Sequence, residues 1–151
     1  MVNVGDAMPD STLVGDAGPM KLRDRIGKTL VVYFYPKDET AGCTAEACSF
    51  RDQYEDFVAA GADVIGVSRD DAASHASFKQ HHRLPFTLLS DPGGAVAKAW
   101  GVRGTLGLVP GRVTFVFDKT GTCKHRFDSQ LRFGKHVDEA RAIVEQLSKH
   151  S

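Results

Sequence analysis

Cysteine is scarce in this chain of 151 residues, which has three cysteines, one tryptophan and no long hydrophobic run. A small, odd number of cysteines does not fit the disulfide framework of a small secreted protein. No apolar run approaches the ~20 residues that a membrane-spanning helix needs. Lys plus Arg and Asp plus Glu are both 19, so the formal net charge is zero. This balance argues against broad electrostatic binding of nucleic acid or an anionic membrane.

The remaining composition is that of an ordinary globular protein, with 42% hydrophobic and 25% charged residues. Its length predicts a single domain over residues 1–151. The first ten residues, MVNVGDAMPD, lack the basic region and apolar core of a secretory signal. We therefore expect a cytoplasmic protein, although a mature organelle protein trimmed of its transit peptide would show the same features.

The chemistry of the chain is concentrated between Leu30 and Phe57. An apolar strand over residues 30–35 ends at Pro36, a polar loop follows, and Cys43 precedes a predicted helix over about residues 44–60. At ~100° per residue, Cys43 falls on the apolar face of this helix and Cys48 on its flank. One sulfur should therefore point inward and the other nearer to solvent. The apolar face comprises Ala47, Phe50, Tyr54, Phe57 and Val58.

The position of Cys43 favours a reactive thiolate, because free N–H groups and the helix dipole stabilise negative charge at a helix N-terminus. Cys48 is less well placed. On an intact helix the Cα atoms of the two cysteines would be about 8.6 Å apart, beyond the ~7 Å limit for a disulfide. If the two cysteines bond, the first turns of the helix must unwind.

Three sequence segments resemble those of the peroxiredoxins. PKDETAGC at residues 36–43 fits the P-x-x-x-T-x-x-C signature, and TAEACSFRD at 44–52 resembles the PrxQ, or bacterioferritin comigratory protein, subfamily. The segment LVPGRVTF at 108–115 is similar to the one that supplies the family's active-site arginine, here Arg112. One departure is Ala41, where many members have a second proline; no reactive group is lost.

This resemblance implies a thiol-dependent peroxidase that uses no cofactor and no metal. Cys43 would be the peroxidatic cysteine, oxidised to a sulfenic acid by hydrogen peroxide or an organic hydroperoxide, and Cys48 the resolving cysteine. Thioredoxin, or a related dithiol reductant, would reduce the resulting disulfide. Thr40 and Arg112 would hold the peroxide oxygens. The subfamily is often monomeric, so we expect a monomer.

The resemblance also predicts a pocket around the sulfur, to which Pro36, Gly42 and Trp100 would contribute. Pro36 has no N–H and suits a dry wall, and the loop backbone can offer amides. Trp100 is interpreted mainly as a core residue, with lining of the peroxide pocket as its alternative role. The glycine-rich loop over residues 101–111 lacks a nucleotide-binding pattern and should shape the pocket mouth and present Arg112.

Three alternatives stay open on sequence grounds. A zinc site would need a second ligand pair after Cys43 and Cys48, and a disulfide oxidoreductase would need a C-x-x-C motif. A redox sensor or holdase switched by the same disulfide is the alternative function.

Cys123 is interpreted as a small buried residue in a strand. The six histidines are interpreted as surface residues, with His81 and His82 pointing in different directions.

The rest of the chain predicts an α/β protein with the thioredoxin-like fold, in which helices flank a central mixed sheet. A short edge hairpin is expected within residues 1–27. Strands are expected at 63–68, 113–118 and 122–127, with an extended segment at 84–89. Helices are expected at about 71–82, 95–100 and 135–149, the last with an apolar face that covers the sheet.

Overall fold

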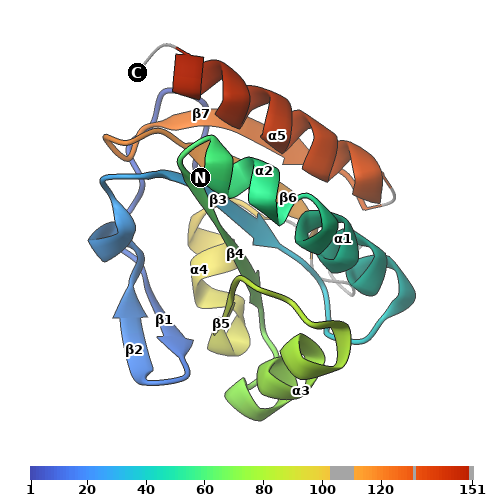
Figure 1. Ribbon diagram of the computed structural model, residues 1–151. Helices are drawn as coiled ribbons and strands as arrows, with labels where there is room; N and C mark the ends of the chain where they lie inside the picture. Colours follow the sequence, from blue (N-terminus) through green and yellow to red (C-terminus); the bar gives the residue numbers. More distant parts are fainter. Residues whose placement is uncertain (103–110, 131, 150–151) are drawn as a thin grey trace.

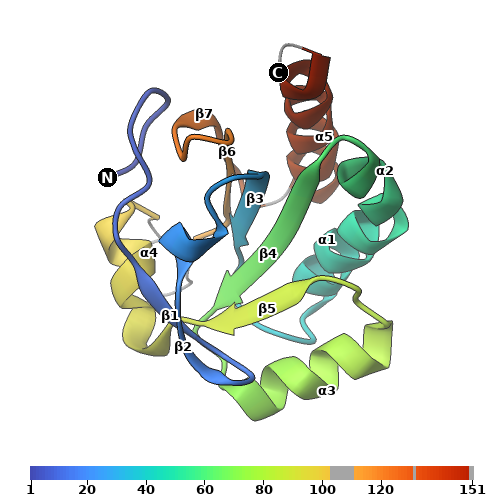
Figure 2. The same ribbon diagram turned by 60° about the vertical axis from the view of Figure 1, so that its left-hand side comes forward.

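The structure is a computed structural model, and its description covers residues 1–102, 111–130 and 132–149. Within these ranges, seven strands form one mixed sheet in the order β2-β1-β5-β4-β3-β6-β7 (Figures 1 and 2). The central strands β3, β4 and β5 are parallel, whereas β1, β2, β6 and β7 pair antiparallel to their neighbours. The strands are β1 (Thr12–Gly15), β2 (Gly18–Lys21), β3 (Thr29–Phe34), β4 (Ala62–Ser68), β5 (Thr87–Ser90), β6 (Val113–Phe117) and β7 (Cys123–Asp128).

Helices cover both faces of the sheet (Figure 2). One face packs against α1 (Ala41–Asp52), α2 (Tyr54–Ala59), α3 (Ala72–His82) and α5 (Phe133–Lys149), which all contribute to one apolar cluster. The other face carries the short helix α4 (Ala95–Ala99) and N-terminal residues, which form a second cluster. Two 3₁₀ turns, η1 (Leu22–Arg25) and η2 (Pro92–Gly94), complete the elements. No helix within the described ranges has the length and apolar character needed to cross a bilayer.

Strand β3 explains why the central sheet needs cover on both sides. All six of its residues are buried. Val31 and Tyr33 enter the cluster beneath α1 and α5, whereas Leu30, Val32 and Phe34 enter the other cluster. Alternate side chains of a strand point to opposite faces, so a continuous apolar run fits a strand buried on both.

The mixed sheet flanked by helices and the N-terminal hairpin of β1 and β2 confirm the predicted fold. Cys123 is fully buried in β7, as its sequence context indicated. The residues 103–110, for which we predicted a role at the pocket mouth, lie outside the described residues.

The helix predicted over 44–60 is wrong in two respects. It begins at Ala41, so that Cys43 lies within its first turn, and it breaks at Gln53, whose φ of −106° and ψ of 6° are not helical. The break changes the rotation of α2 relative to α1. Phe57 therefore stays buried, whereas Val58, predicted on the apolar face, is 53% exposed.

Trp100 lies at the end of α4, in the apolar cluster on the opposite face of the sheet from Cys43. Its ring is fully buried and makes edge contacts with Phe34 and Phe115 at 5.3 and 5.2 Å between centroids. Its Nε1 donates a hydrogen bond of 2.9 Å to the Ser11 hydroxyl. The structure thus gives Trp100 a place in the core and does not bring it to the cysteine.

Replacing Trp100 with Phe separates the core role from the pocket role. We expect Trp100→Phe to lower the free energy of unfolding by about 1–3 kcal/mol, because it leaves a void and removes the bond to Ser11. The rate of Cys43 oxidation by hydrogen peroxide should not change. Urea unfolding followed by circular dichroism measures the first effect, since the chain has no other tryptophan for fluorescence. Unchanged stability with slower oxidation would place Trp100 in the pocket instead.

Candidate active site

The sheet topology brings three segments that are distant in the sequence to one end of the strands. Strand β3 ends at Phe34, which pairs with Val113 at the start of β6, so Arg112 emerges beside the loop that follows β3. Strand β7 ends at Asp128, which also pairs with Val113, so the chain that leads into α5 reaches the same end of the strands. The α1 N-terminus, Arg112 and the α5 N-terminus therefore meet, although Cys43 and Arg112 are 69 positions apart in the sequence.

Arg112 contacts the sulfur of Cys43 directly. Its Nη2 donates a hydrogen bond of 3.3 Å to Sγ, and both residues are buried, with 1% of Cys43 and 4% of Arg112 exposed. Burial lowers the local dielectric constant, so a cation at this distance interacts more strongly with a thiolate than it would in water. This contact and the N-terminus of α1 place positive charge beside the Cys43 sulfur.

The guanidinium of Arg112 is fixed on three further sides. Its Nη1 donates 2.8 Å to Glu46 Oε1, and its Nε donates 3.2 Å to the Gln130 carbonyl. Its Cζ lies 4.7 Å from the centre of the Phe133 ring. A planar fork held in this way presents Nη2 to the sulfur in one orientation.

Glu46 is the acidic partner of Arg112 and was not among the predicted site residues. It lies three residues after Cys43 on α1 and is fully buried. Burial raises its pKa to about 7, although Arg112 acts in the opposite direction. Its second oxygen, Oε2, has no hydrogen-bond partner among the described residues and lies 3.7 Å from Nδ1 of His136.

His136, on α5, is fully buried and corrects the prediction that all histidines lie at the surface. Burial lowers its pKa to about 4, so the ring is neutral near pH 7. Its Nε2 donates 2.7 Å to the Ser129 carbonyl, which leaves Nδ1 to accept a 2.8 Å hydrogen bond from the Thr114 hydroxyl. The neutral ring therefore brings no positive charge to Glu46, whose Oε2 lies 3.7 Å from Nδ1.

Gly42 occupies a position with no room for a side chain. A Cβ there would lie 2.6 Å from Cζ of Phe133 and 3.3 Å from Nη2 of Arg112. The glycine therefore lets the ring that packs on Arg112 approach the first turn of α1. Gly42 thus lies beside the guanidinium that contacts the Cys43 sulfur.

Thr40 and Pro36 lie at the start of the same region. Thr40 is the N-cap residue of α1 and is exposed; its carbonyl accepts a hydrogen bond from Thr44 N–H. Its hydroxyl donates 2.8 Å to the Lys37 carbonyl, which leaves the oxygen able to accept a bond. Pro36 is half-buried shortly after the strand. Thr40 is thus placed by its role as helix cap, three residues before Cys43.

A buried network anchors the loop between β3 and α1. Asp38 accepts hydrogen bonds from Tyr35 (2.5 Å) and Ser74 (2.8 Å) and lies 2.7 Å from His75 Nδ1. Burial alone would raise the pKa of Asp38, but the bonds from His75, Tyr35 and Ser74 outweigh it and lower that pKa. His75 is buried, so the surface role predicted for it is also wrong. The network ties the loop to α3.

Cys48 lies on α1 and is half-buried, whereas Cys43 is buried, as the predicted helix faces indicated. Both are free thiols in the structure. Among the described residues, no cluster of three possible metal ligands includes either cysteine. The alternative of a zinc site at these two residues therefore gains no support.

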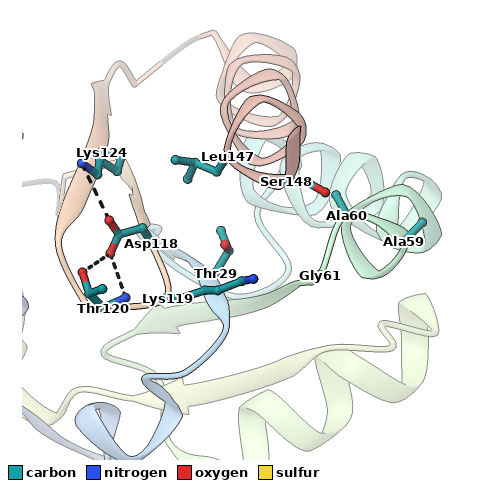
Figure 3. Close-up of a pocket in the computed structure, with 10 residues that line it drawn as sticks. All are labelled: Thr29, Ala59, Ala60, Gly61, Asp118, Lys119, Thr120, Lys124, Leu147 and Ser148. Atoms are coloured by element: carbon teal, nitrogen blue, oxygen red, sulfur yellow. Dashed lines mark hydrogen bonds and ion pairs between the residues drawn. The ribbon is translucent and has the colours of Figure 1, made fainter. Parts of the chain in front are cut away.

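A pocket of about 540 Å³ lies at the other end of the strands (Figure 3). Its wall includes Thr29 at the start of β3, Gly61 before β4, Asp118 after β6 and Leu147 near the end of α5. The described residues that line it include no cysteine and none of the predicted site residues. The chemistry of the thiols is therefore separate from this pocket.

Known proteins match the chain over almost its whole length. The profile of the AhpC/TSA family matches residues 4–126. Chloroplastic peroxiredoxin Q of Oryza sativa subsp. japonica is 50% identical over 97% of this chain and 68% of its own length. The Arabidopsis thaliana protein of the same name is 53% identical over 91% of the chain and 65% of its own length. The chain belongs to the AhpC/TSA family, as a peroxiredoxin of the Q type.

Solved structures agree with this membership and with the thioredoxin-like fold. Peroxidoxin BcpB from Mycobacterium tuberculosis superposes with a TM-score of 0.88 at 34% identity, covering 97% of this chain and 98% of the other. Peroxiredoxin Q from Xanthomonas campestris superposes with a TM-score of 0.84 at 31% identity, covering 98% of both. As a peroxiredoxin, the protein is a thiol peroxidase, with a hydroperoxide as substrate and a reductant as second partner.

The predicted cytoplasmic location is contradicted by this comparison. The plant relatives from Oryza sativa and Arabidopsis thaliana are chloroplastic proteins. Composition and the first ten residues were an insufficient basis for the prediction, since a mature organelle protein has the same features.

Replacing Glu46 with Gln tests the raised pKa. A raised carboxyl pKa means that Glu46 stabilises the fold below pH 4.5 and that this contribution is lost as the pH rises through about 7. Gln keeps an oxygen for Arg112 but does not ionise. We expect the stability of Glu46→Gln relative to wild type to rise across this interval, by on the order of 2–3 kcal/mol.

Urea unfolding at a series of pH values measures this difference. His136 has a lowered pKa and acts in the opposite direction, adding stability as the pH rises from about 4 through 6.5. It is present in both proteins, so its own effect largely cancels in the comparison. A difference in unfolding free energy that does not change with pH would show that folding does not raise the pKa of Glu46.

Proposed function

We propose that this peroxiredoxin reduces hydroperoxides by a two-cysteine mechanism in which Cys43 attacks and Cys48 resolves. The Cys43 thiolate attacks one oxygen of the peroxide, the O–O bond breaks, and the other oxygen leaves as an alcohol or water after taking a proton. Cys43 becomes a sulfenic acid. The Cys48 thiolate then attacks the oxidised sulfur and releases water, which leaves a Cys43–Cys48 disulfide.

The observation that carries this proposal is the contact between Arg112 and the Cys43 sulfur at 3.3 Å. The same guanidinium that stabilises the thiolate can donate to the peroxide oxygen next to it and to the charge that develops on the leaving oxygen. We assign the Thr40 hydroxyl oxygen, at the cap of α1, as the acceptor of the peroxide O–H, and the amide of Gly42 as a further donor to the peroxide. Pro36 forms part of the wall beside them.

Disulfide formation requires a change in α1. Cys43 and Cys48 lie on the same 12-residue helix, where their Cα atoms would be about 8.6 Å apart. Since a disulfide needs ~7 Å or less, the first turns of α1 unwind after Cys43 is oxidised. Cys48 is already partly exposed, so the disulfide that forms can be reached by a dithiol protein.

We assign thioredoxin, or a related dithiol protein, as the reductant that returns both cysteines to thiols. Hydrogen peroxide and organic hydroperoxides are the proposed substrates. In support, the bacterioferritin comigratory protein of Xanthomonas campestris, which is 30% identical to this chain, has alkyl peroxide reduction activity. We propose a monomer. The chloroplastic relatives favour a plastid as its location.

Single cysteine variants test the two roles. We expect Cys43→Ser to abolish peroxide turnover, because it removes the attacking sulfur. Cys48→Ser should still undergo the first oxidation, seen by rapid mixing, but should fail to turn over with thioredoxin. Cys123→Ala is the matched control and should keep the wild-type rate, since Cys123 is buried in β7 away from the site.

Two results would contradict the proposal. Equal steady-state activity of wild type and Cys48→Ser would show that only one cysteine is needed. A slow, single oxidation of the wild type that alters partner binding without repeated turnover would favour the redox sensor. Peptide mapping by mass spectrometry after stoichiometric peroxide identifies the linked residues.

A further inference from the structure

Two neighbouring histidines at the end of α3 converge on one glutamate of the loop before α1. His81 Nδ1 lies 2.9 Å from Oε2 of Glu39, and His82 Nε2 lies 2.7 Å from Oε1. This geometry corrects the prediction that the two histidines point in different directions. His81 contacts the carboxylate through Nδ1, the ring nitrogen nearer to the backbone, and His82 through Nε2, the more distant one. This difference lets two adjacent residues of a helix reach the same carboxylate.

The three side chains offer three metal ligands close to one another. Their ligand atoms all lie within 4.8 Å of one another. Two imidazoles and one carboxylate are ligands that Zn²⁺ and related transition metals prefer, and a fourth position remains for water.

The Glu39 carboxylate lies close to both imidazoles at nearly the spacing that a bound ion requires. Ligand atoms at ~2.0–2.1 Å in a tetrahedral zinc site are separated by about 3.3 Å. With Glu39 Oε1 as the ligand oxygen, its distance of 3.2 Å to His81 Nδ1 is already close to this value, whereas its distance of 2.7 Å to His82 Nε2 would open by about 0.6 Å. His81 and Glu39 are 65% and 44% exposed, so an ion can reach them from solvent, whereas His82 is only 18% exposed and is held in place.

The backbone at this point supports a fixed arrangement. Glu39 has a left-handed conformation with a φ of 64°, which is uncommon for a residue other than glycine. The preceding residue, Asp38, is fixed to α3 by the buried network with His75. The His82 carbonyl accepts a 2.8 Å bond from Arg51, which joins the end of α3 to α1. Loop, α1 and α3 thus meet beneath the three ligands.

We propose that Glu39, His81 and His82 bind a divalent transition-metal ion of the zinc class, and that the bound ion slows formation of the Cys43–Cys48 disulfide. The second part rests on the proposed function. Glu39 directly precedes Thr40, the cap of α1, so an ion that fixes Glu39 to α3 restricts the segment that must move when α1 unwinds. The metal would act as a brake on the resolving step.

The binding test uses the full chain with Cys43→Ser and Cys48→Ser, which removes accessible thiol ligands. Metal-free protein is titrated with Zn²⁺ by calorimetry and with Co²⁺ by absorbance, near neutral pH where imidazoles are largely neutral. We expect a single ion per chain and a Co²⁺ spectrum without thiolate charge transfer. Adding His81→Ala or Glu39→Gln should weaken binding by more than about tenfold.

Gln80→Ala, a change next to His81, is the matched control and should bind the metal like its parent. Equal affinity in the Glu39 and His81 variants would overturn the site. The brake is tested in the chain with all its cysteines, by following disulfide formation with and without Zn²⁺. We expect a severalfold slowing in wild type that is absent in His81→Ala.

Slowing of equal size in wild type and His81→Ala would show that zinc acts on the thiols, and would overturn the brake. No slowing in wild type at saturating zinc would overturn it too. Failure of the proposed function is distinguishable, because metal-free wild type would then form no Cys43–Cys48 disulfide, whereas metal binding to Glu39, His81 and His82 is measured without any peroxide.

Discussion

The contact between the Arg112 guanidinium and the Cys43 sulfur is the interaction on which the site depends. A buried thiolate without a compensating cation would be costly, and a buried arginine without acceptors would be equally so. Here each group reduces the cost of the other, and Glu46 and the Gln130 carbonyl accept hydrogen bonds from two further N–H groups of the guanidinium. The surrounding residues therefore serve mainly to keep one guanidinium beside one sulfur.

The protonation of Glu46 bears on how the charge of Arg112 is shared. With a pKa raised to about 7, Glu46 is partly protonated near neutral pH, which leaves more of the positive charge for the sulfur. His136 is neutral and offers no positive charge of its own. The burial of Glu46 and His136 thus sets the charge around Arg112, whose own charge does not change with pH.

Much of this arrangement can be predicted from the sequence, because its signals are local. Continuous apolar runs indicated the buried strands, and the 3.6-residue period placed Cys43 inward and Cys48 on the flank. Glu46 was also within reach of such reasoning, since it follows Cys43 by three residues on the same helix. The break at Gln53 was not, because no proline or glycine marks it.

Other site residues depend on tertiary contacts that no local pattern encodes. Phe133 and His136 join the site only because β6 and β7 pair antiparallel and return α5 to the end of β3. His75 resembles a surface residue until Asp38 is seen to be buried beside it. The convergence of His81 and His82 likewise requires the left-handed backbone at Glu39, which a glutamate in a loop does not indicate.

The most direct test is the rate at which Cys43 reacts with hydrogen peroxide in a single turnover, compared between wild type and Arg112→Met. Met fills similar space without charge, and Glu46 can take up a proton when its partner is lost. Removing a donor of this kind should lower the second-order rate constant by about 10²–10³-fold, with the fold retained by circular dichroism. A folded Arg112→Met protein that reacts at the wild-type rate would contradict the account.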